Sequence, residues 1–331
     1  MIIDIHGHVL APPELYAYQS SLLASRGAHG RGRVNVSDER LLSAVWMNGK
    51  THLELLDAAG TDIQFISPRP FQMIHSQKPE KIVHWYTEEA NNIIARVCKL
   101  LPNRFRGVGG LPQNMDVSPK NTLEEMERCV KELGFVGIML NPDPNEGQGV
   151  PPGLGDEYWY PIYEKAVELD VPLLVHSASC LNPRESYSLH FINEETTAVI
   201  SLLNSKVFQD FPNLKIVISH GGGAVPYQIG RWMAGRYQKP GAEPFEESIR
   251  RLYFDTCLYT KEALELLFKV VGTDRCMFGS ETPGTGTAIN PNTGRSMDDT
   301  RPIIESIEFL TEEQKKMIFS ENAKKVYNLK L

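Results

Sequence analysis

The stretch EETTAVISLLNSKVFQDFPNLKIVISH (194–220) combines two hydrophobic patterns. In 194–211 the apolar residues lie three and four positions apart, which predicts an amphipathic helix. The short apolar run at 214–220 predicts a strand that is buried on both faces. A helix that leads into a buried strand is typical of proteins built around a parallel sheet.

The same two patterns alternate along the chain. Helical periodicity recurs at 79–101, 121–134, 160–170 and 260–272. Buried-strand runs recur at MIIDIH (1–6), DIQFIS (62–67), RFRGVGGL (104–111), FVGIML (135–140), PLLVH (172–176), RLYFDT (251–256) and RCMFGS (275–280). With 214–220 this makes eight strands, so we predict an α/β fold, a single (β/α)8 TIM barrel, for which about 250 residues is typical.

The residues beyond that typical length fall at two places. A long first βα loop, 11–50, contains the Gly- and Arg-rich segment SRGAHGRGR (25–33), and we expect it to be a lid or a subunit-contact insertion. A C-terminal helical tail opens on TEEQ (311–314), which has the form of a capping box. No interdomain linker stands out, so residues 1–331 are expected to form one domain.

Composition narrows the partners and the compartment. The net charge is −7, and no block of Lys and Arg is available to neutralise phosphates, which argues against a nucleic-acid or acidic-membrane partner. No stretch has the length of a membrane span. The five cysteines are scattered and never in CxxC spacing, which fits reduced thiols in a cytoplasmic protein.

Histidines gather at the carboxyl ends of the predicted strands. Side chains two positions apart on a strand point to the same face, so His6 and His8, on either side of Gly7, can turn toward one point. The pattern HxH alone also occurs in solvated strand ends. All strand ends meet on one face of a closed barrel, so we expect one cleft there. It would contain His6, His8, His176, His220 and Glu281. Individually, each could instead be a core histidine bonded to a carbonyl, or a carboxylate in water.

Three imidazoles and one carboxylate are a donor set that suits Zn²⁺, with Mn²⁺ as the alternative. A single ion is expected, because the fourth strand ends GIMLNP (137–142) without the lysine that commonly bridges two metals in such barrels. If Glu281 binds loosely, an open position remains for a metal-bound water whose pKa can fall to about 7, and Glu281 would be its base.

Five motifs resemble the amidohydrolase superfamily, in the branch typified by aminocarboxymuconate semialdehyde decarboxylase. They are DIHGH (4–8), LLVH (173–176), VISHGGGAVPYQIGRW (217–232), FGSETP (278–283) and ENAKKVYNL (321–329). The resemblance implies that the metal ligands are His6, His8, His176 and Glu281. It implies that His220 polarises the substrate or transfers a proton, and that the region of 225–237 contributes to a homodimer or a larger homo-oligomer.

One residue departs from that branch. Its decarboxylases have aspartate in a motif like FGSDYP, whereas this chain has Glu281, one methylene longer. Instead, ISPRPFQMIHS (66–76) and SETPGTG (280–286) resemble the 4-oxalomesaconate hydratase family. That resemblance implies water addition to the C3=C4 bond of 4-oxalomesaconate, giving 4-carboxy-4-hydroxy-2-oxoadipate in protocatechuate 4,5-cleavage. Glu281 would deprotonate the water, and His220 or Glu281 would protonate C3.

The implied substrate is a small polycarboxylate with three negative groups. Loop residues that leave the same barrel face could pair with them: Arg69, His75, Arg184, Tyr187 and His190. Asp255, at the end of the seventh strand, could orient a ligand or cap a loop. Three other functions stay open: a nonoxidative decarboxylase of an aromatic or muconate-like acid, a metal-dependent hydrolase of a dicarboxylate lactone or an amide, and a binding protein with a closed structural metal site.

Overall fold

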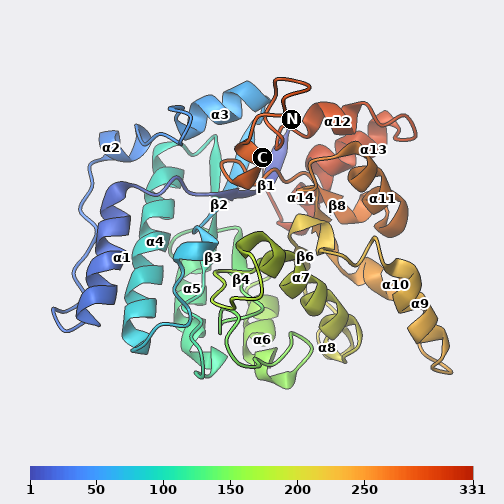
Figure 1. Cartoon of the computed structure of the whole chain (residues 1–331), viewed down its shortest axis with the longest axis horizontal. Coiled ribbons are helices and arrows are strands. Elements are labelled where there is room, and N and C mark those ends of the chain that lie inside the picture. The colour runs from blue at the N-terminus through green and yellow to red at the C-terminus, as the bar shows by residue number, and fades with distance from the viewer. Residues whose placement is uncertain (331) are drawn as a thin grey trace.

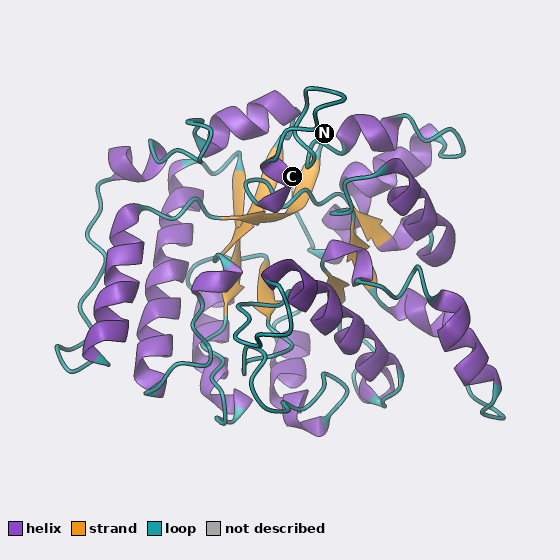
Figure 2. Cartoon of the chain, in the orientation of Figure 1, coloured by secondary structure: helices purple, strands orange, loops and turns teal. Residues whose placement is uncertain are grey.

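In the computed structural model, which describes residues 1–330, eight parallel strands pair in the order of the chain. Backbone hydrogen bonds from Ile5 to Phe278 (2.9 Å) and from Glu281 to His6 (2.7 Å) join the first strand to the last region. The predicted TIM barrel is confirmed, with strands inside and helices outside (Figure 2). The strands are β1 (Ile3–His8), β2 (Ile63–Ser67), β3 (Phe105–Gly110), β4 (Gly137–Leu140), β5 (Leu173–Val175), β6 (Ile216–Ile218), β7 (Tyr253–Asp255) and β8 (Cys276–Met277).

The helices surround this sheet (Figure 1). They are α1 (Pro13–Ser25), α2 (Asp38–Leu42), α3 (His52–Ala59), α4 (Glu80–Leu100), α5 (Leu123–Lys131), α6 (Tyr160–Glu168), α7 (Tyr187–Leu203), α8 (Val207–Asp210), α9 (Ile229–Tyr237), α10 (Phe245–Ser248), α11 (Lys261–Val271), α12 (Arg301–Glu305), α13 (Glu312–Lys316) and α14 (Asn322–Val326). Within residues 1–330, none of them has the length and hydropathy that crossing a membrane requires.

The helix predicted at 194–211 was wrong in extent. α7 begins earlier, where Ser186 caps the backbone N–H of Leu189, and it ends at Leu203 before the short α8. The hydroxyl of Ser205 donates to Leu202 O and accepts from Val207 N. These side-chain bonds to the backbone compete with the helical pattern and explain the break.

The first βα connection is partly an additional outer helix. α1 packs beside α4, and its Leu15 and Leu22 share a buried cluster with Ile82 and Tyr86 of α4 (Figure 1). Further along the connection, Trp46 stacks on Arg69, with the guanidinium carbon of Arg69 4.4 Å from the centroid of the Trp46 ring.

An apolar layer fills the lower part of the barrel. It contains Ile5, Phe65, Val108, Met139, Leu174, Val217 and Met277. Tyr327, from the C-terminal tail, packs against Phe65 with ring centroids 4.8 Å apart. The predicted capping box of that tail is confirmed, because Thr311 and Gln314 satisfy each other's backbone N–H at the start of α13. His8 is the last residue of β1, and His176 and His220 come one and two residues after the carboxyl ends of β5 and β6.

A β-bulge in β1 carries the first two histidines to that end. Asp4 pairs with Gln64 and Gly7 pairs with Ile66, so β1 has one residue more than β2 over this interval. A bulge resets the alternation of side chains. As a result, Ile5 joins the apolar layer and the next residue, His6, also reaches the interior, where it contacts the histidine that follows β5.

Candidate metal centre and active site

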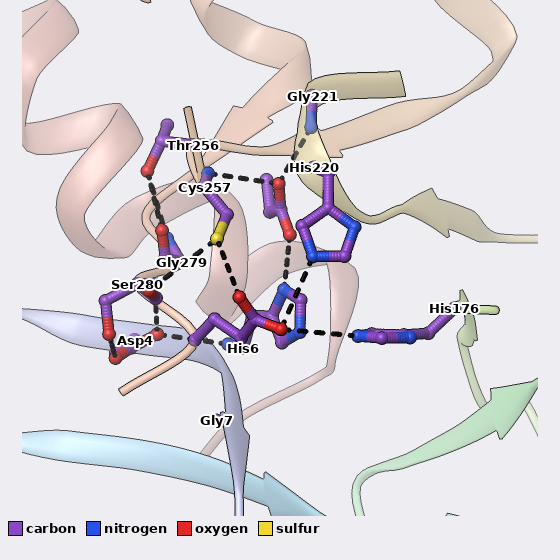
Figure 3. Close-up of polar contacts among 12 residues, drawn as sticks. Asp4, His6, Gly7, His176, His220, Gly221, Thr256, Cys257, Gly279 and Ser280 are labelled. Atoms are coloured by element: carbon purple, nitrogen blue, oxygen red, sulfur yellow. Dashed lines mark hydrogen bonds and ion pairs between the residues drawn. The ribbon is translucent and has the colours of Figure 1, made fainter. Parts of the chain in front are cut away.

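Four buried histidines surround the carboxylate of Glu281, above the apolar layer. Figure 3 shows three of them, His6, His176 and His220, turned toward one another from β1 and from the segments that follow β5 and β6. The ring centroid of His176 lies 4.9 Å from that of His6, 5.1 Å from that of His8 and 5.0 Å from that of His220. Glu281 Oε1 lies 3.8 Å from His8 Nε2, 4.0 Å from His176 Nε2 and 3.5 Å from His220 Nε2.

Each of the four imidazole rings uses Nδ1 for a hydrogen bond to the surrounding protein, so its Nε2 is the nitrogen that faces the Glu281 carboxylate. His176 Nδ1 lies 2.6 Å from the carbonyl oxygen of Ser177. A carbonyl only accepts, so this Nδ1 carries the hydrogen and Nε2 of the neutral ring has a free lone pair. The other three rings also use Nδ1, with Asp255 Oδ2 at 2.6 Å from His6, Ser67 Oγ at 2.8 Å from His8, and Glu195 Oε1 at 2.8 Å from His220.

These residues fit a divalent cation. The Nε2 atoms of His6, His8 and His176 are buried and have no hydrogen-bond partner. Leaving such acceptors unpaired in the interior is costly, and a cation would satisfy all of them together. Nδ1 bonded to a carboxylate, carbonyl or hydroxyl oxygen is also how metal-binding histidines are usually oriented.

The geometry leaves a choice for the third imidazole. One potential ligand atom from each of His6, His176, His220 and Glu281 lies within 4.8 Å of the others, and His8 is outside this set. Even so, we favour His8 over His220 as the ligand. The Nε2 of His8 has no partner, whereas Glu195 holds His220 through both of its oxygens, at 2.8 and 2.9 Å.

Charge distinguishes the two histidines in the same way. Burial lowers the pKa of His8 to about 4, which keeps its lone pair available. Burial would also lower the pKa of His220, but the charge and hydrogen bonds of Glu195 outweigh it and the pKa rises well above its usual value. Burial alone would raise the pKa of Glu281, but the polar interactions with the His220 and His8 imidazoles outweigh this, so the pKa falls well below its usual value and the group is a carboxylate.

Several residues that the sequence did not single out hold these groups. Tyr259 donates its hydroxyl to Glu281 Oε2 at 2.8 Å. Glu195 lies on α7, where no strand-end pattern could indicate it. Ser67 ends β2, so the reasoning that found the histidines could have found it as well. Asp255, which was considered from the sequence, binds His6 Nδ1 and accepts from the backbone N–H groups of Gly221, after β6, and of Cys257, after β7.

The turn after β6 requires glycine. Gly221, Gly222 and Gly223 have φ values of 61°, 84° and 63°, in the left-handed region where side chains are disfavoured. The N–H of Gly221 donates to Asp255 Oδ1 at 3.0 Å, and α9 begins only at Ile229. The turn therefore holds the carboxylate at the end of β7, ahead of α9.

Arg69 is a buried cation beside the histidine cluster. It is 4% exposed, its Nε has no partner, and one terminal nitrogen donates to Pro283 O at 3.2 Å. Among residues 1–330, no carboxylate lies within ion-pair distance of its guanidinium. Tyr187 lies nearby, packed on Phe191 with ring centroids 4.4 Å apart, and burial together with the charge of Glu281 raises its pKa.

The structure does not bring the other three predicted substrate-binding residues to the groups around Glu281. Arg184 is exposed. His75 is buried, with Nδ1 at 2.8 Å from the amide nitrogen of Asn141, and burial lowers its pKa to about 4. His190 lies between Glu185, at 2.7 Å, and Asp143, at 3.5 Å. Substrate contact by these three remains a prediction.

Comparison with known proteins finds relatives over the whole length. A family model described as Amidohydrolase matches residues 3–329. The 2-keto-4-carboxy-3-hexenedioate hydratase of Sphingobium sp. (strain NBRC 103272 / SYK-6) is 35% identical, covering 99% of this chain and 96% of the relative. The crystal structure of 4-oxalomesaconate hydratase from Rhodopseudomonas palustris is 37% identical, with a TM-score of 0.89, covering 99% of this chain and 96% of that one.

A more distant structure shares the fold. The dihydroxybenzoic acid decarboxylase from Polaromonas sp. JS666, solved with bound manganese, is 23% identical with a TM-score of 0.71, covering 99% of this chain and 96% of that one. The two relatives with 35% and 37% sequence identity are both hydratases, whereas the decarboxylase, at 23% identity, is similar to this chain in fold alone.

Proposed function

The chain belongs to the amidohydrolase family, and on this premise we propose that it is a metal-dependent hydro-lyase that adds water to 4-oxalomesaconate, giving 4-carboxy-4-hydroxy-2-oxoadipate. In this proposal the enzyme serves aromatic-acid degradation by protocatechuate 4,5-cleavage. The substrate is a small tricarboxylate.

One observation carries the proposal beyond the relatives' names. A buried glutamate carboxylate, Glu281, faces four imidazoles, and Arg69 lies beside this cluster as a buried cation with no carboxylate of the described residues within ion-pair distance. The cluster offers a base and a metal site, and the arginine offers a place for a substrate carboxylate. This combination fits water addition to an anionic enone.

The metal would be held by His6, His8, His176 and Glu281. We propose Zn²⁺, because imidazole and carboxylate are its usual ligands, and Mn²⁺ is the alternative found in the Polaromonas enzyme. When bound, such an ion acts as a Lewis acid that polarises a substrate oxygen and acidifies water. Asp255, Ser67 and Ser177 would orient the imidazoles through Nδ1.

The protein residues account for both protons of the reaction. Glu281 takes one proton from water while the water oxygen bonds to C4. The electrons of the C3=C4 bond then move toward the C2 oxygen, which gives an enolate. When the enolate collapses, C3 takes one proton either from Glu281 or from His220 Nε2, which then recovers a proton from Glu281, so one water is added in total. Tyr259 holds the second oxygen of Glu281, and Glu195 holds Nδ1 of His220.

The assay that tests this function follows two products. With purified enzyme and 4-oxalomesaconate, we expect loss of the enone absorbance and formation of the hydroxy acid without release of CO₂. Release of CO₂ from this compound, or from an aromatic or muconate-like acid, would instead support a decarboxylase. Hydrolysis of a dicarboxylate lactone in parallel reactions would support the hydrolase alternative.

Replacing Arg69 should weaken substrate binding more than turnover. A hydrogen bond to a charged group contributes about 1.5–3 kcal/mol, so we expect Arg69→Gln to lower kcat/KM about 10- to 100-fold, mainly through KM. Arg251→Gln is the matched control, since Arg251 is exposed at the opposite end of the barrel and pairs with Glu243. An unchanged KM in Arg69→Gln would contradict this role.

Four further features complete the proposal. We propose that 11–50 acts as a lid through Trp46, which stacks on Arg69 and donates to Thr287 Oγ1 at 3.0 Å. A homo-oligomer is supported by α9, in which no residue is buried. A cytoplasmic location is supported by five free thiols, and one domain by the single barrel.

A further inference from the structure

A second group of metal-ligand side chains lies outside the histidine cluster. Asp143 is on the loop after β4, Glu185 precedes α7, and His190 and Glu194 are four residues apart on α7. That spacing puts His190 and Glu194 on the same face of the helix. One potential ligand atom from each of Asp143, His190 and Glu194 lies within 4.8 Å of the others.

His190 is oriented in the same way as the histidines around Glu281. Its Nδ1 lies 2.7 Å from Glu185 Oε2, and its Nε2 faces Asp143 Oδ2 at 3.5 Å. The side chain is 1% exposed, and Nε2 has no hydrogen-bond partner. A buried nitrogen that faces a carboxylate without forming a hydrogen bond is an observation separate from the acidic residues themselves.

The carboxylates here outnumber the cations. Three carboxylates, Asp143, Glu185 and Glu194, face one imidazole, and in residues 1–330 no Lys or Arg lies within 4.0 Å of them. Burial and the charge of Asp143 raise the pKa of Glu194, which is the effect expected where negative charge is crowded. Backbone N–H groups of Asn145 and Gly147, at 2.9 and 2.6 Å, hold the Asp143 carboxylate in place.

We propose that His190 Nε2, Asp143 and Glu194 form a second divalent-cation site, with Glu185 orienting the imidazole. One imidazole with carboxylate oxygens suits Mn²⁺. The ion would connect the loop after β4 to α7. On α7 the residue after Glu194 is Glu195, which binds His220 of the first site. The site is separate from the catalytic metal and does not depend on the proposed reaction.

Manganese binding tests this site without measuring activity. The metal-free protein is first loaded with one equivalent of Zn²⁺, which occupies the histidine-rich cluster, and Mn²⁺ displaces this ion poorly because Mn²⁺ lies lower in the affinity order of divalent ions. Mn²⁺ is then titrated and the free ion is followed by electron paramagnetic resonance. We expect the wild-type chain to take up one equivalent of Mn²⁺ beyond its zinc, and the same addition to raise the Tm.

Two variants and one control decide the outcome. Glu194→Gln keeps the shape of the side chain and removes a crowded charge, so its fold is expected to persist; His190→Gln is the second variant. Each should weaken Mn²⁺ binding at least about 10-fold. Glu164→Gln makes the same change at an exposed residue of α6 and should bind like the wild type. The proposed site would be refuted if the wild type took up no Mn²⁺, or if both variants bound Mn²⁺ as tightly as the wild type does.

Discussion

The Glu281→Gln variant is expected to fold and to retain its metal but to lose about 10²- to 10⁴-fold in kcat, the range that general acid–base catalysis typically contributes. The amide has the shape of the carboxylate but cannot take a proton from water. Glu281 is 7% exposed and hydrogen-bonded by Tyr259, so water from bulk solvent does not replace it as a base. Stopped-flow measurement of enone loss, with metal analysis of the same sample, checks this result.

Two further variants interpret that loss. Glu308→Gln makes the same substitution at an exposed glutamate, and it should leave kcat unchanged. Glu281→Asp restores the carboxylate of the decarboxylase motif but shortens it by one methylene. It should also be slow without releasing CO₂, because the position of the carboxylate matters as well as its charge. A Glu281→Gln enzyme with wild-type kcat and full metal content would remove Glu281 from catalysis.

Removing the metal should abolish activity and lower thermal stability together. Dialysis against a chelator is expected to reduce turnover at least about 10³-fold, because Lewis-acid assistance is worth several kcal/mol. The Tm should fall as well, since an ion that binds only the folded chain stabilises it. One equivalent of Zn²⁺ should restore both. Turnover that survives complete metal removal would refute the metal-dependent mechanism.

Cobalt substitution reports on the ligands without relying on turnover. The visible spectrum of bound Co²⁺ depends on its donor atoms, so His176→Asn and His8→Asn should change the spectrum or prevent binding. His220→Asn should preserve it, because Glu195 holds His220 outside the favoured ligand set. His29→Asn is the matched control at an exposed histidine. A spectrum altered by His220→Asn and unchanged by His8→Asn would exchange their roles.

Much of the barrel and the location of its site follow from patterns within single segments. The alternation of apolar runs and helical periodicity predicted eight strands, and the strand-end rule placed His6, His176 and Glu281 on one face. The helices at 79–101 and 260–272 match α4 and α11 within a residue at each end. At 194–211 the periodicity continued through Ser205, whose hydroxyl bonds broke the helix.

Contacts between segments far apart in the chain could not be predicted from the sequence. Trp46 reaches Arg69 from another connection, and Glu195 reaches His220 from α7. The bulge that brings His6 to the interior is visible only in the pairing of β1 with β2. Each depends on how two elements pack, and no local pattern of residues encodes that.

The sequence by itself determined the barrel, the end of the barrel that carries the site and the residue types available there, because hydrophobic period and strand-end position are local properties of the chain. Only the tertiary structure decided which imidazole nitrogens are free, which histidine is held by Glu195, and which arginine is buried without a carboxylate. Hydrogen-bond partners and burial are set by neighbours far away in the chain, so they exist only once the barrel has closed.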